Sequence, residues 1–476
     1  MRTAPASITV FGTSAAVLVV ETIAGRLMAP YVGISLETFT GIIGTMLAGI
    51  AVGAGVGGWL ADRWDPRRMV GPAIVAGGAL CWLSLPVISA LGPLVGTGPV
   101  AIVTLTVASF FLPVAVLSAV SPMVAALRLD RLDHTGSVVG GLSAAGTFGA
   151  LVGTFLTGFV LVAALPSRVV VLLVGAVLVV VGIAASWRLA RSRPDVPTVA
   201  AVLVCLAVGQ GAGTPCEQET AYYCVRVESD ASDPSVRDLY LDRLRHASVD
   251  LDDPTALDIR YVRLLADVVD AQPPGPLDTL HVGGGGFTLP RYVQAERPGS
   301  TDRVVEIDGE LVDIAEDELG LELGDGISVE VGDGRLVIDE QPTDSVDLVV
   351  GDAFGSQAVP WHLTTVEVVE EIDRALRPGG VYAMNVLDGG GSHFARAQIA
   401  TLDAVFDHVA MVEPERGIPG SGTTNLVLVA SDAPLAPLDV EAGDGRVVDG
   451  AELDAFVDGA DRLTDDHAPV DQLLRR

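Results

Sequence analysis

Acidic residues follow three apolar runs in the second half of the chain. Glu306 and Asp308 stand at the end of DRVVEID, Asp333 follows ISVEVG, and Asp352 follows SVDLVVG. A carboxylate accepts hydrogen bonds from sugar hydroxyls, such as those of a ribose. These residue types at these places therefore predict a nucleoside-binding site.

A run of four glycines precedes these acids. Gly283, Gly284, Gly285 and Gly286 follow the apolar run LDTLHV and come before a helical pattern that begins at 289. Glycine lets a ligand approach the backbone closely, and free N–H groups at the start of a helix point outward to a ligand. Taken alone, the run fits a plain turn equally well.

The order of the elements brings these residues to one edge. Strand-like runs at 277–282, 302–308, 327–331 and 345–351 are joined by helical patterns, and the third run also delivers Gly334. Ligands bind beyond the carboxyl ends of such strands, where an acidic residue about 20 positions past the glycines commonly holds a ribose. The chain has no GKS/T signature and no spaced dinucleotide motif, which disfavours a nucleoside triphosphate hydrolase and makes a dinucleotide less favoured.

The segment before this α/β pattern predicts a small β-rich lead-in. TAYYCVRVES reads as a strand, RDLYLDRL as a second short apolar element, and TALDIRYVRLLADVV as a helix. We therefore expect three parts: a transmembrane domain at 1–212, the lead-in at 213–270 and the α/β domain at 271–476.

Long apolar runs dominate the first 212 residues. A spanning helix needs about 20 apolar residues. Six runs reach that length, and a shorter seventh follows: 7–28, 38–60, 70–92, 99–127, 138–164, 168–187 and 197–212. Small residues crowd 44–58 and 140–158, which favours close helix packing over a transport pathway. Glu21 and Arg26 lie in the first run, where ionisable groups are functional candidates by default.

Charge divides the chain into the same two halves. Residues 1–212 hold 11 Arg and 7 acidic residues, a net +4, whereas residues 213–476 hold 18 Arg and 53 acidic residues, a net −35. A soluble half this acidic repels phosphates, so we expect no nucleic-acid partner. The expected partner of the first half is the lipid bilayer, and the sequence leaves homo-oligomerisation open.

Arginines cluster in alternate loops of the membrane half, which indicates its orientation. They are Arg63, Arg67 and Arg68 after the second run, Arg128 and Arg131 after the fourth, and Arg188, Arg191 and Arg193 after the sixth. The positive-inside rule places these loops in the cytoplasm. The acidic half then lies outside the cell if the seventh run spans, which we favour, and inside if it does not.

The four cysteines give a second indication of compartment. Cys216 and Cys224 bracket CEQETAYYC and predict a local disulfide if this segment faces an oxidising compartment. Cys81 and Cys205 lie in apolar runs, where a cysteine is usually a packing residue. No CxxC pair or His cluster indicates zinc, so we expect no metal.

The motifs HVGGGG, VVEID, VGDGR, DLVVGDAFG and LRPGGVYAMN resemble the spermidine synthase (polyamine aminopropyltransferase) family over roughly 217–430. The whole chain is similar to bacterial membrane proteins in which such a domain follows a multi-span segment; ETIAGRLMAPYVG and GALVGTFLTGFVL carry that likeness. The resemblance implies a methyltransferase-like Rossmann domain with a seven-stranded sheet. It also implies transfer of an aminopropyl group to a small-molecule amine.

The resemblance also assigns roles to residues. It implies a site for decarboxylated S-adenosylmethionine, or S-adenosylmethionine itself as co-substrate, made by the glycine loop. Glu306 and Asp308 would hold the ribose, Asp333 would lie near the adenine, Asp352 would be the catalytic proton acceptor, and Tyr261 would flank the amine pocket. Independently of the resemblance, VPWHLTT at 359–365 is a segment that could close over the site, and its His362 is more often a packing residue than a base. LTDDHAPVD fits a capped turn before a final helix, and the alternative is that Asp466 or His467 completes the site.

Three positions depart from the family pattern. Gly286 stands where the family's GGGDGG loop has its Asp, Gly355 replaces a second Asp three residues after Asp352, and Val262 replaces a His after Tyr261. Three functions therefore stay open: an aminopropyl or related transferase, an S-adenosylmethionine-dependent methyltransferase, and a non-catalytic, transporter-like protein with a ligand-sensing domain.

Overall fold

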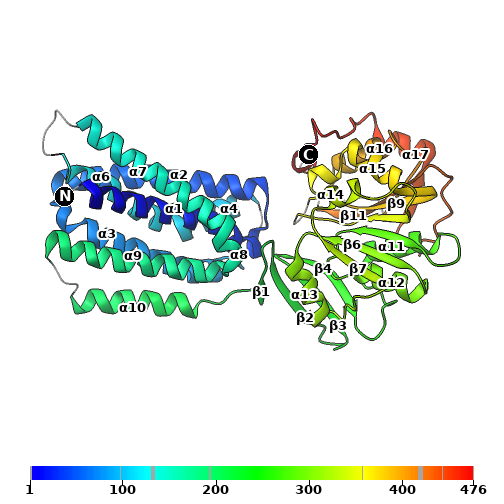
Figure 1. Ribbon diagram of the computed structural model, residues 1–476, viewed down its shortest axis with the longest axis horizontal. Coiled ribbons are helices and arrows are strands. Elements are labelled where there is room, and N and C mark those ends of the chain that lie inside the picture. The colour runs from blue at the N-terminus through cyan, green and yellow to red at the C-terminus, as the bar shows by residue number, and fades with distance from the viewer. Residues whose placement is uncertain are drawn as a thin grey trace. The chain divides into compact units, whose positions relative to one another are not determined.

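The computed structural model describes residues 3–96, 98–129, 135–191, 195–355, 358–415, 422–441 and 443–474. The chain divides into two compact units, Met1–Cys224 and Val225–Arg476, which Figure 1 colours from blue to green and from green to red. Arg131 and Arg193, used above for orientation, lie outside the described residues. The domain limits expected at 212 and 270 stay predictions.

The first unit contains six helices that are long and apolar enough to cross a membrane: Ala4–Val32, Leu36–Arg63, Pro66–Leu91, Pro99–Ala126, Thr135–Ala164 and Ser167–Ala190. They confirm the six expected spans and support a multi-pass membrane protein. The helical segments are α1 (Thr3–Val32), α2 (Leu36–Arg63), η1 (Pro66–Arg68), α3 (Val70–Leu91), α4 (Pro99–Thr106), η2 (Val107–Phe111), α5 (Leu112–Ser118), α6 (Val120–Ala126), α7 (Thr135–Leu156), η4 (Thr157–Leu161), α8 (Val162–Ala164), α9 (Ser167–Ala190) and α10 (Val196–Gly211).

Glycines allow the helix backbones of this unit to touch. A Cβ added at Gly53 of α2 would lie 2.1 Å from the carbonyl oxygen of Ala115 in α5. One added at Gly149 of α7 would lie 2.2 Å from the carbonyl oxygen of Phe11 in α1. Both glycines come from the two small-residue stretches, so close packing explains those stretches at these positions. Glu21 is half-buried in α1.

The second unit is built on a mixed sheet, and its described residues form eight strands in the order β12–β10–β11–β9–β8–β5–β6–β7. Strands β7, β6, β5, β8 and β9 are mutually parallel, and β11, β10 and β12 add antiparallel pairs. Their bounds are β5 (Asp278–Val282), β6 (Thr301–Glu306), β7 (Ile327–Val331), β8 (Val346–Gly351), β9 (Leu376–Asp388), β10 (His408–Glu413), β11 (Thr424–Ser431) and β12 (Arg446–Asp449). The edge strand β12 exceeds the seven strands that the resemblance implied.

Helices cover both faces of this sheet, as a Rossmann-like methyltransferase fold requires (Figure 1). One core joins the strands to α14, α15 and α16, and the other joins them to α11 and α12. Most strands are apolar almost throughout because both of their faces are buried. The remaining helices are α11 (Arg260–Asp270), α12 (Thr288–Glu296), α13 (Gly309–Glu318), α14 (Gly334–Asp339), η5 (Trp361–Leu363), α15 (Val366–Ala375), α16 (His393–Leu402), α17 (Gly450–Val457) and α18 (Val470–Leu473).

A small antiparallel sheet precedes the Rossmann-like fold. Strands β2 (Cys224–Ser229), β3 (Val236–Leu241) and β4 (Leu244–Asp250) pair in succession, after a short strand β1 (Gln218–Glu219). The sequence pattern indicated β2 and one further element at 237–244, but it missed β4. A tight turn at Asp242, whose φ is 53°, reverses the chain inside that element.

Candidate active site

The glycine loop and Asp352 meet where the strand order reverses. β5 lies between β6 and β8, so the loops that follow β5 and β8 lie side by side at the switch point of the sheet. The Asp352 N–H donates to the Val282 carbonyl at 2.9 Å. Gly283 has a φ of 103°, and a Cβ there would lie 2.6 Å from the Asp352 carbonyl oxygen. Only glycine fits at this contact.

The side chain of Glu306 accepts hydrogen bonds from two backbone N–H groups of the glycine loop. Its Oε2 accepts hydrogen bonds from the N–H groups of Gly284 at 2.8 Å and Gly285 at 3.3 Å, and its Oε1 accepts from Asp308 N–H at 3.0 Å. The carboxyl is buried, and burial raises its pKa. The loop N–H groups expected to point at a ligand therefore bind a carboxylate of the neighbouring strand. Asp308 is also buried and begins α13.

Asp352 sits in a polar network that spans several elements. Its Oδ1 accepts a hydrogen bond from Asn385 Nδ2 at 2.7 Å, and its Oδ2 lies 3.2 Å from the hydroxyl of Tyr261. Asn425 Nδ2 donates in turn to Asn385 Oδ1 at 2.9 Å. Burial raises the pKa of the Asp352 carboxyl to about 6, against the lowering effects of the Asn385 and Tyr261 bonds and of nearby His281. A carboxyl of that pKa ionises close to neutral pH, as a proton acceptor should.

A cavity of about 60 Å³ lies against this network. Its lining includes the four loop glycines, Tyr261, Asp352 and two imidazoles, those of His246 and His281. Nε2 of His281 lies 2.9 Å from Asp302 Oδ1, an aspartate buried on β6. Sequence reasoning thus identified Tyr261 and Asp352 on this wall and missed both histidines.

Asp333 and Gly334 lie at the end of the neighbouring strand β7. A Cβ added at Gly334 would lie 2.6 Å from Cγ1 of Val282, so the start of α14 packs directly on the end of β5. Asp333 accepts a hydrogen bond from Arg335 N–H at 2.9 Å and pairs with His362 Nε2 at 3.4 Å. The side chain of Asp333 is 36% exposed, so a ligand could still reach it.

The C-terminal segment reaches the same region through a residue that the sequence reading did not favour. Asp465 accepts hydrogen bonds from Thr365 Oγ1 at 2.7 Å and from Arg335 at 3.1 and 3.2 Å. His467 instead forms a bridge with Thr464, which fits the capped-turn interpretation of LTDDHAPVD. The role of Asp466 stays a prediction.

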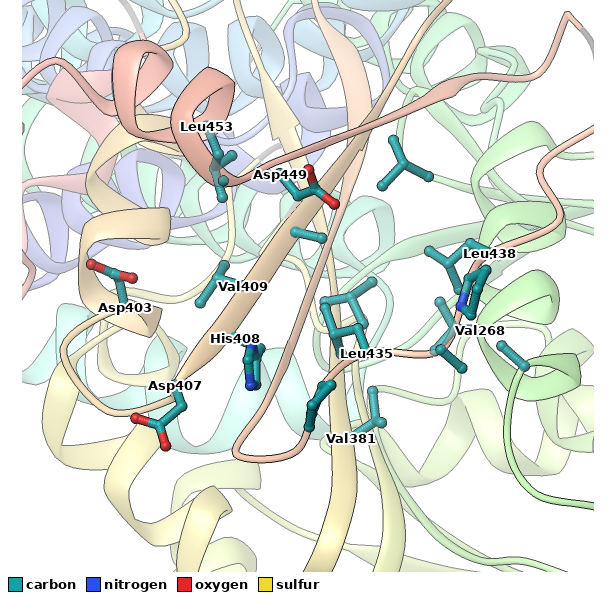
Figure 2. Close-up of a pocket in the computed structure, with 18 of the residues that line it drawn as sticks. Val268, Val381, Asp403, Asp407, His408, Val409, Leu435, Leu438, Asp449 and Leu453 are labelled. Carbon is teal, nitrogen blue, oxygen red and sulfur yellow. The ribbon is translucent and has the colours of Figure 1, made fainter.

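A second cavity of about 700 Å³ lies at the opposite end of the strands. Figure 2 shows Val381, His408 and Asp449 around it, with Leu435 on the segment that crosses it. Val381 lies early in β9 and His408 begins β10, so this cavity is remote from the carboxyl ends of the parallel strands. Its place in the fold does not match the ligand edge of an open α/β sheet.

The missed residues left only faint signals in the sequence. His246 belongs to LRHASVD, whose alternation after the turn at Asp242 is that of a strand. His281 and Asn385 interrupt the apolar runs LDTLHV and VYAMNV, and a polar residue inside a buried strand needs a partner. The partners could not be named from the sequence because they come from other elements.

Comparisons with known proteins agree with this fold. No family model matches the chain. A probable spermidine synthase from Corynebacterium glutamicum is similar at 26% identity with a TM-score of 0.50, over 52% of this chain and 95% of that one. A spermidine synthase from Thermotoga maritima matches at 18% identity and a TM-score of 0.35, over 45% and 74% of the two chains. Human methyltransferase-like protein 13, in complex with SAH, matches at 20% and 0.32, over 46% and 93%.

These neighbours cover about half of this chain. The likeness to the Corynebacterium protein supports an aminopropyl- or methyl-transferase-like domain in the second unit, and the weaker likenesses carry no further argument. The roles of the site residues named above remain predictions.

Proposed function

We propose that this protein is a membrane-bound group transferase that moves an aminopropyl or related group from an adenosylsulfonium donor to an amine. The observation that carries the proposal is the position of Asp352. Its carboxyl has a pKa of about 6, lies at the switch point beside the glycine loop, and faces a cavity with Tyr261. Proton acceptors for amines need this combination of access and pKa.

The residues at the strand ends fit a nucleoside donor. Glu306 uses three acceptor positions on backbone N–H groups, and a carboxylate offers about four, so one position remains for a ribose hydroxyl. Asp333 is accessible for a second contact. No Arg lines the cavity among the described residues, so a carboxylate on the donor would have no cationic partner there and would face Asp352. This favours decarboxylated S-adenosylmethionine over S-adenosylmethionine.

Asp352 and Tyr261 provide the proton chemistry. A bound adenosylsulfonium supplies an electrophilic carbon beside its positively charged sulfur. Asp352 takes a proton from the ammonium of the acceptor, which frees the nitrogen lone pair to form the new C–N bond while the C–S bond breaks. The Tyr261 hydroxyl, 3.2 Å from Asp352 Oδ2, and Asn385 hold the carboxylate in place.

Product identity tests the proposal. The purified full-length protein is incubated with each donor and a panel of amines, and nucleoside products are separated by chromatography. Methylthioadenosine formation that is lost in Asp352→Asn and kept in His408→Gln, a substitution at the remote cavity, is the expected result. S-adenosylhomocysteine would instead indicate a methyltransferase. No nucleoside product with any amine would end the transferase proposal.

We further propose that the second unit lies outside the cytoplasm. α10 follows the end of α9 after five residues, and its own end returns to the start of α9, where Arg168 donates to the carbonyls of Gly209 and Gln210. α10 is thus a seventh pass, although its 16 residues span only about 24 Å. The chain then leaves the bundle opposite the Arg-rich loops at 63–68 and 188–191.

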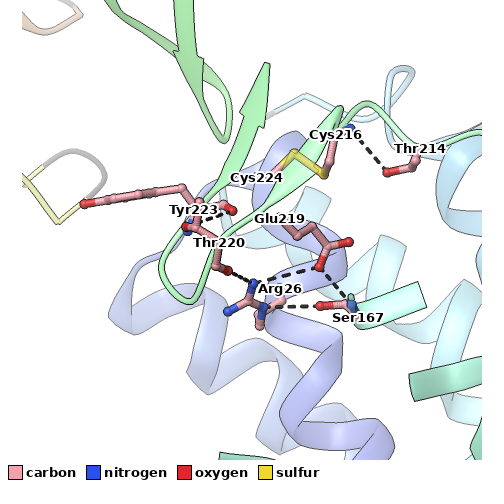
Figure 3. The surroundings of a disulfide bond; sticks show 8 residues. All are labelled: Arg26, Ser167, Thr214, Cys216, Glu219, Thr220, Tyr223 and Cys224. Carbon is pink, nitrogen blue, oxygen red and sulfur yellow. Dashed lines mark hydrogen bonds and ion pairs between the residues drawn. A yellow bond between two sulfur atoms is a disulfide. The ribbon is translucent and has the colours of Figure 1, made fainter. Parts of the chain in front are cut away.

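Two local features support this placement. Cys216 and Cys224 are disulfide-bonded, and such bonds persist mainly in oxidising compartments. Figure 3 shows the loop that they close lying against Arg26 at the end of the bundle. Arg26 donates to Ala221 O at 2.6 Å and to Ser167 Oγ at 3.2 Å, so this arginine is held by local acceptors and is no exception to the positive-inside rule.

Thiol labelling in intact cells tests the placement. A membrane-impermeant maleimide should label Cys216 and Cys224 only after an impermeant reductant has opened the bond, and a Cys81→Ala, Cys205→Ala background removes other thiols. Labelling that requires cell lysis would place the second unit in the cytoplasm.

A second candidate function is ligand sensing without chemistry. The disulfide favours it, because adenosylsulfonium compounds are made inside cells and an external site would rarely meet them. In that case the second unit binds a nucleoside or an amine, and no methylthioadenosine forms.

A further inference from the structure

One carboxyl of the first unit lies deep within a spanning helix. Glu21 is in the span Ala4–Val32, about three turns, or roughly 16 Å of helix, before Val32. In the described parts of the six spans, every other charged residue lies within about two turns of a helix end: Arg26, Glu37, Asp62, Arg63, Arg67, Arg68, Arg168 and Arg188. A charged group at the depth of Glu21 is costly and marks a functional candidate.

The Glu21 carboxyl has no partner among the described residues, with which it forms neither a hydrogen bond nor an ion pair. Arg26 is the next cation along the same helix, but its guanidinium is held elsewhere. It donates to Ala221 O at 2.6 Å and to Ser167 Oγ at 3.2 Å, and it lies 3.8 Å from Glu219. Glu21 therefore has no counter-charge within the first unit as described.

The face of α1 that bears Glu21 runs between α7 and α2. Ser14 and Gly25 share this face, because they lie about two turns before and one turn after Glu21. A Cβ added at Gly146 of α7 would lie 3.3 Å from the Ser14 hydroxyl, and one added at Gly25 would lie 3.4 Å from the Phe39 ring of α2. Glu21 is half-buried, so its side chain lies at the boundary between these two helices.

The fifth span has a π-helical turn at the level of Glu21. A Cβ added at Gly149 would meet the Phe11 carbonyl and one added at Gly153 would meet the Ala15 carbonyl, so α1 and α7 run in the same direction. Continuing this register places the π-helix η4, Thr157–Leu161, beside 19–23 of α1. Single π-helical turns are rare and occur frequently at functional sites. The break in α7 and the deep carboxyl of α1 thus coincide in space.

The surroundings of Glu21 fit a proton better than a metal ion. In the described residues, α4, α5, α6, α7 and η4 have no charged side chain, the charges of α2 and α9 lie at helix ends, and α3 contributes only the buried Cys81 thiol. Hard metal ions take about six oxygen ligands, and the described residues hold no cluster of three His, Cys, Asp or Glu side chains. A proton needs the carboxylate alone.

We propose that Glu21 is a proton-binding site of the first unit, at which the carboxyl exchanges its proton with water. The acid gives up H⁺ to water and becomes a carboxylate, and the reverse step restores it. Hydrocarbon favours the neutral acid, and the anion forms when water reaches the boundary between α2 and α7. Such an exchange within a span is the step on which proton-coupled carriers depend, so the first unit has a role beyond anchoring the second.

Infrared difference spectroscopy of the full-length protein in lipid nanodiscs tests the proposal. The C=O stretch of Glu21 is the band that Glu21→Gln removes, and it is followed from pH 5 to pH 9 in H₂O and in D₂O. We expect this band to give way to a carboxylate band as pH rises, and to shift in D₂O because the proton exchanges with solvent. Asp62→Asn, at an exposed position near the end of α2, is the matched control and should leave the band unchanged.

A second measurement uses the wild-type protein and does not depend on the folding of a variant. Dicyclohexylcarbodiimide is an apolar reagent that reacts with a protonated carboxyl: the carboxyl oxygen bonds to the carbodiimide carbon, the proton moves to nitrogen, and rearrangement gives a stable N-acylurea. Peptide mapping by mass spectrometry should find this adduct on Glu21 and not on Asp62. Labelling of Glu21 should fall at least about tenfold from pH 5 to pH 9, because the carboxylate does not react.

Three results would overturn the proposal. A Glu21 band that keeps its intensity from pH 5 to pH 9 would show a sealed acid that never releases its proton. A carboxylate band at every pH would show a permanent anion. Equal carbodiimide labelling of Glu21 at pH 5 and pH 9 would show that its protonation does not follow the solvent. The outcome is independent of the transferase proposal, because neither measurement involves the second unit.

Discussion

Asp352→Asn should abolish transfer and at the same time make the second unit more stable. The wild-type carboxyl is hydrogen-bonded but buried, and burial raises its pKa from 3.8 to about 6. The folded state therefore holds the proton more tightly than the unfolded chain does. An Asn side chain is neutral at every pH and avoids the cost of a buried charge.

The magnitude follows from the shift. A pKa raised from 3.8 to about 6 corresponds to at most about 3 kcal/mol in favour of the neutral form. The pKa of this carboxyl is higher in the folded state than in the unfolded chain, so wild-type stability falls as pH rises. From about pH 4 the carboxyl of the unfolded chain loses its proton first, and stability falls until the folded carboxyl ionises near pH 6. The advantage of Asp352→Asn is then near zero at pH 4 and complete above pH 6.

The hydrogen bonds of the network permit this substitution. The Asn oxygen can still accept from Asn385 Nδ2, which lies 2.7 Å from the present Oδ1. Its amide can donate to the Tyr261 oxygen, while the Tyr261 hydroxyl turns to the His246 carbonyl at 3.3 Å. No buried donor is left without an acceptor, so the gain from removing the charge is not offset.

Amide hydrogen exchange of the full-length protein measures the effect. Amides in the central strand β9 are expected to exchange only when the second unit opens, so their protection reports its stability. Asp444→Asn is the matched control with the opposite sign, because the Arg263 hydrogen bonds lower the pKa of that carboxyl. Asp444→Asn should be less stable than the wild type at pH 8, and this difference in stability should shrink as pH falls. Reduced protection of Asp352→Asn at pH 8 would refute the reasoning from burial.

Two further substitutions test the packing around the site and the loop. Gly286→Ala should lower the amide protection of β9, because the new Cβ would lie 2.4 Å from Cβ of Ala247 and overpacking costs about 1–3 kcal/mol. Adding Ala247→Gly should restore that protection. A double variant as unstable as the single one would contradict this contact. Arg26→Met should speed proteolysis of the loop at 216–224 in nanodiscs, because the carbonyls of Thr220 and Ala221 lose the Arg26 guanidinium as hydrogen-bond donor. An unchanged rate of cleavage would mean that the disulfide alone holds the loop.

The membrane helices and the order of the α/β elements could be predicted from local sequence alone. Each spanning helix is marked by about 20 apolar residues, and each of the four strands β5 to β8 by a short apolar run that ends in, or is followed by, Gly or Asp. The alternation of these runs with helical patterns predicted the sheet, and parallel strands place their ends at one edge. Strand β4 was missed because its turn at Asp242 falls inside an apolar segment.

The contacts of the site residues depend on elements far apart in the chain. Tyr261 and Asp352 are 91 residues apart, and Asn385 is 33 residues beyond Asp352. The hydrogen bonds of Glu306 to the loop N–H groups form because β5 and β6 are paired in the sheet, and no local pattern encodes that pairing. The same holds for His246, whose partnerless nitrogen is visible only once β4 is placed.

Sequence by itself determined which residues carry charge, which segments avoid water and which strands can share an edge, because hydrophobic burial and backbone geometry act over a few residues. The tertiary structure alone decided the pKa of Asp352, the partners of Glu306 and the burial of the His246 ring nitrogen. Those properties depend on burial and on hydrogen-bond partners that folding brings together from distant parts of the chain.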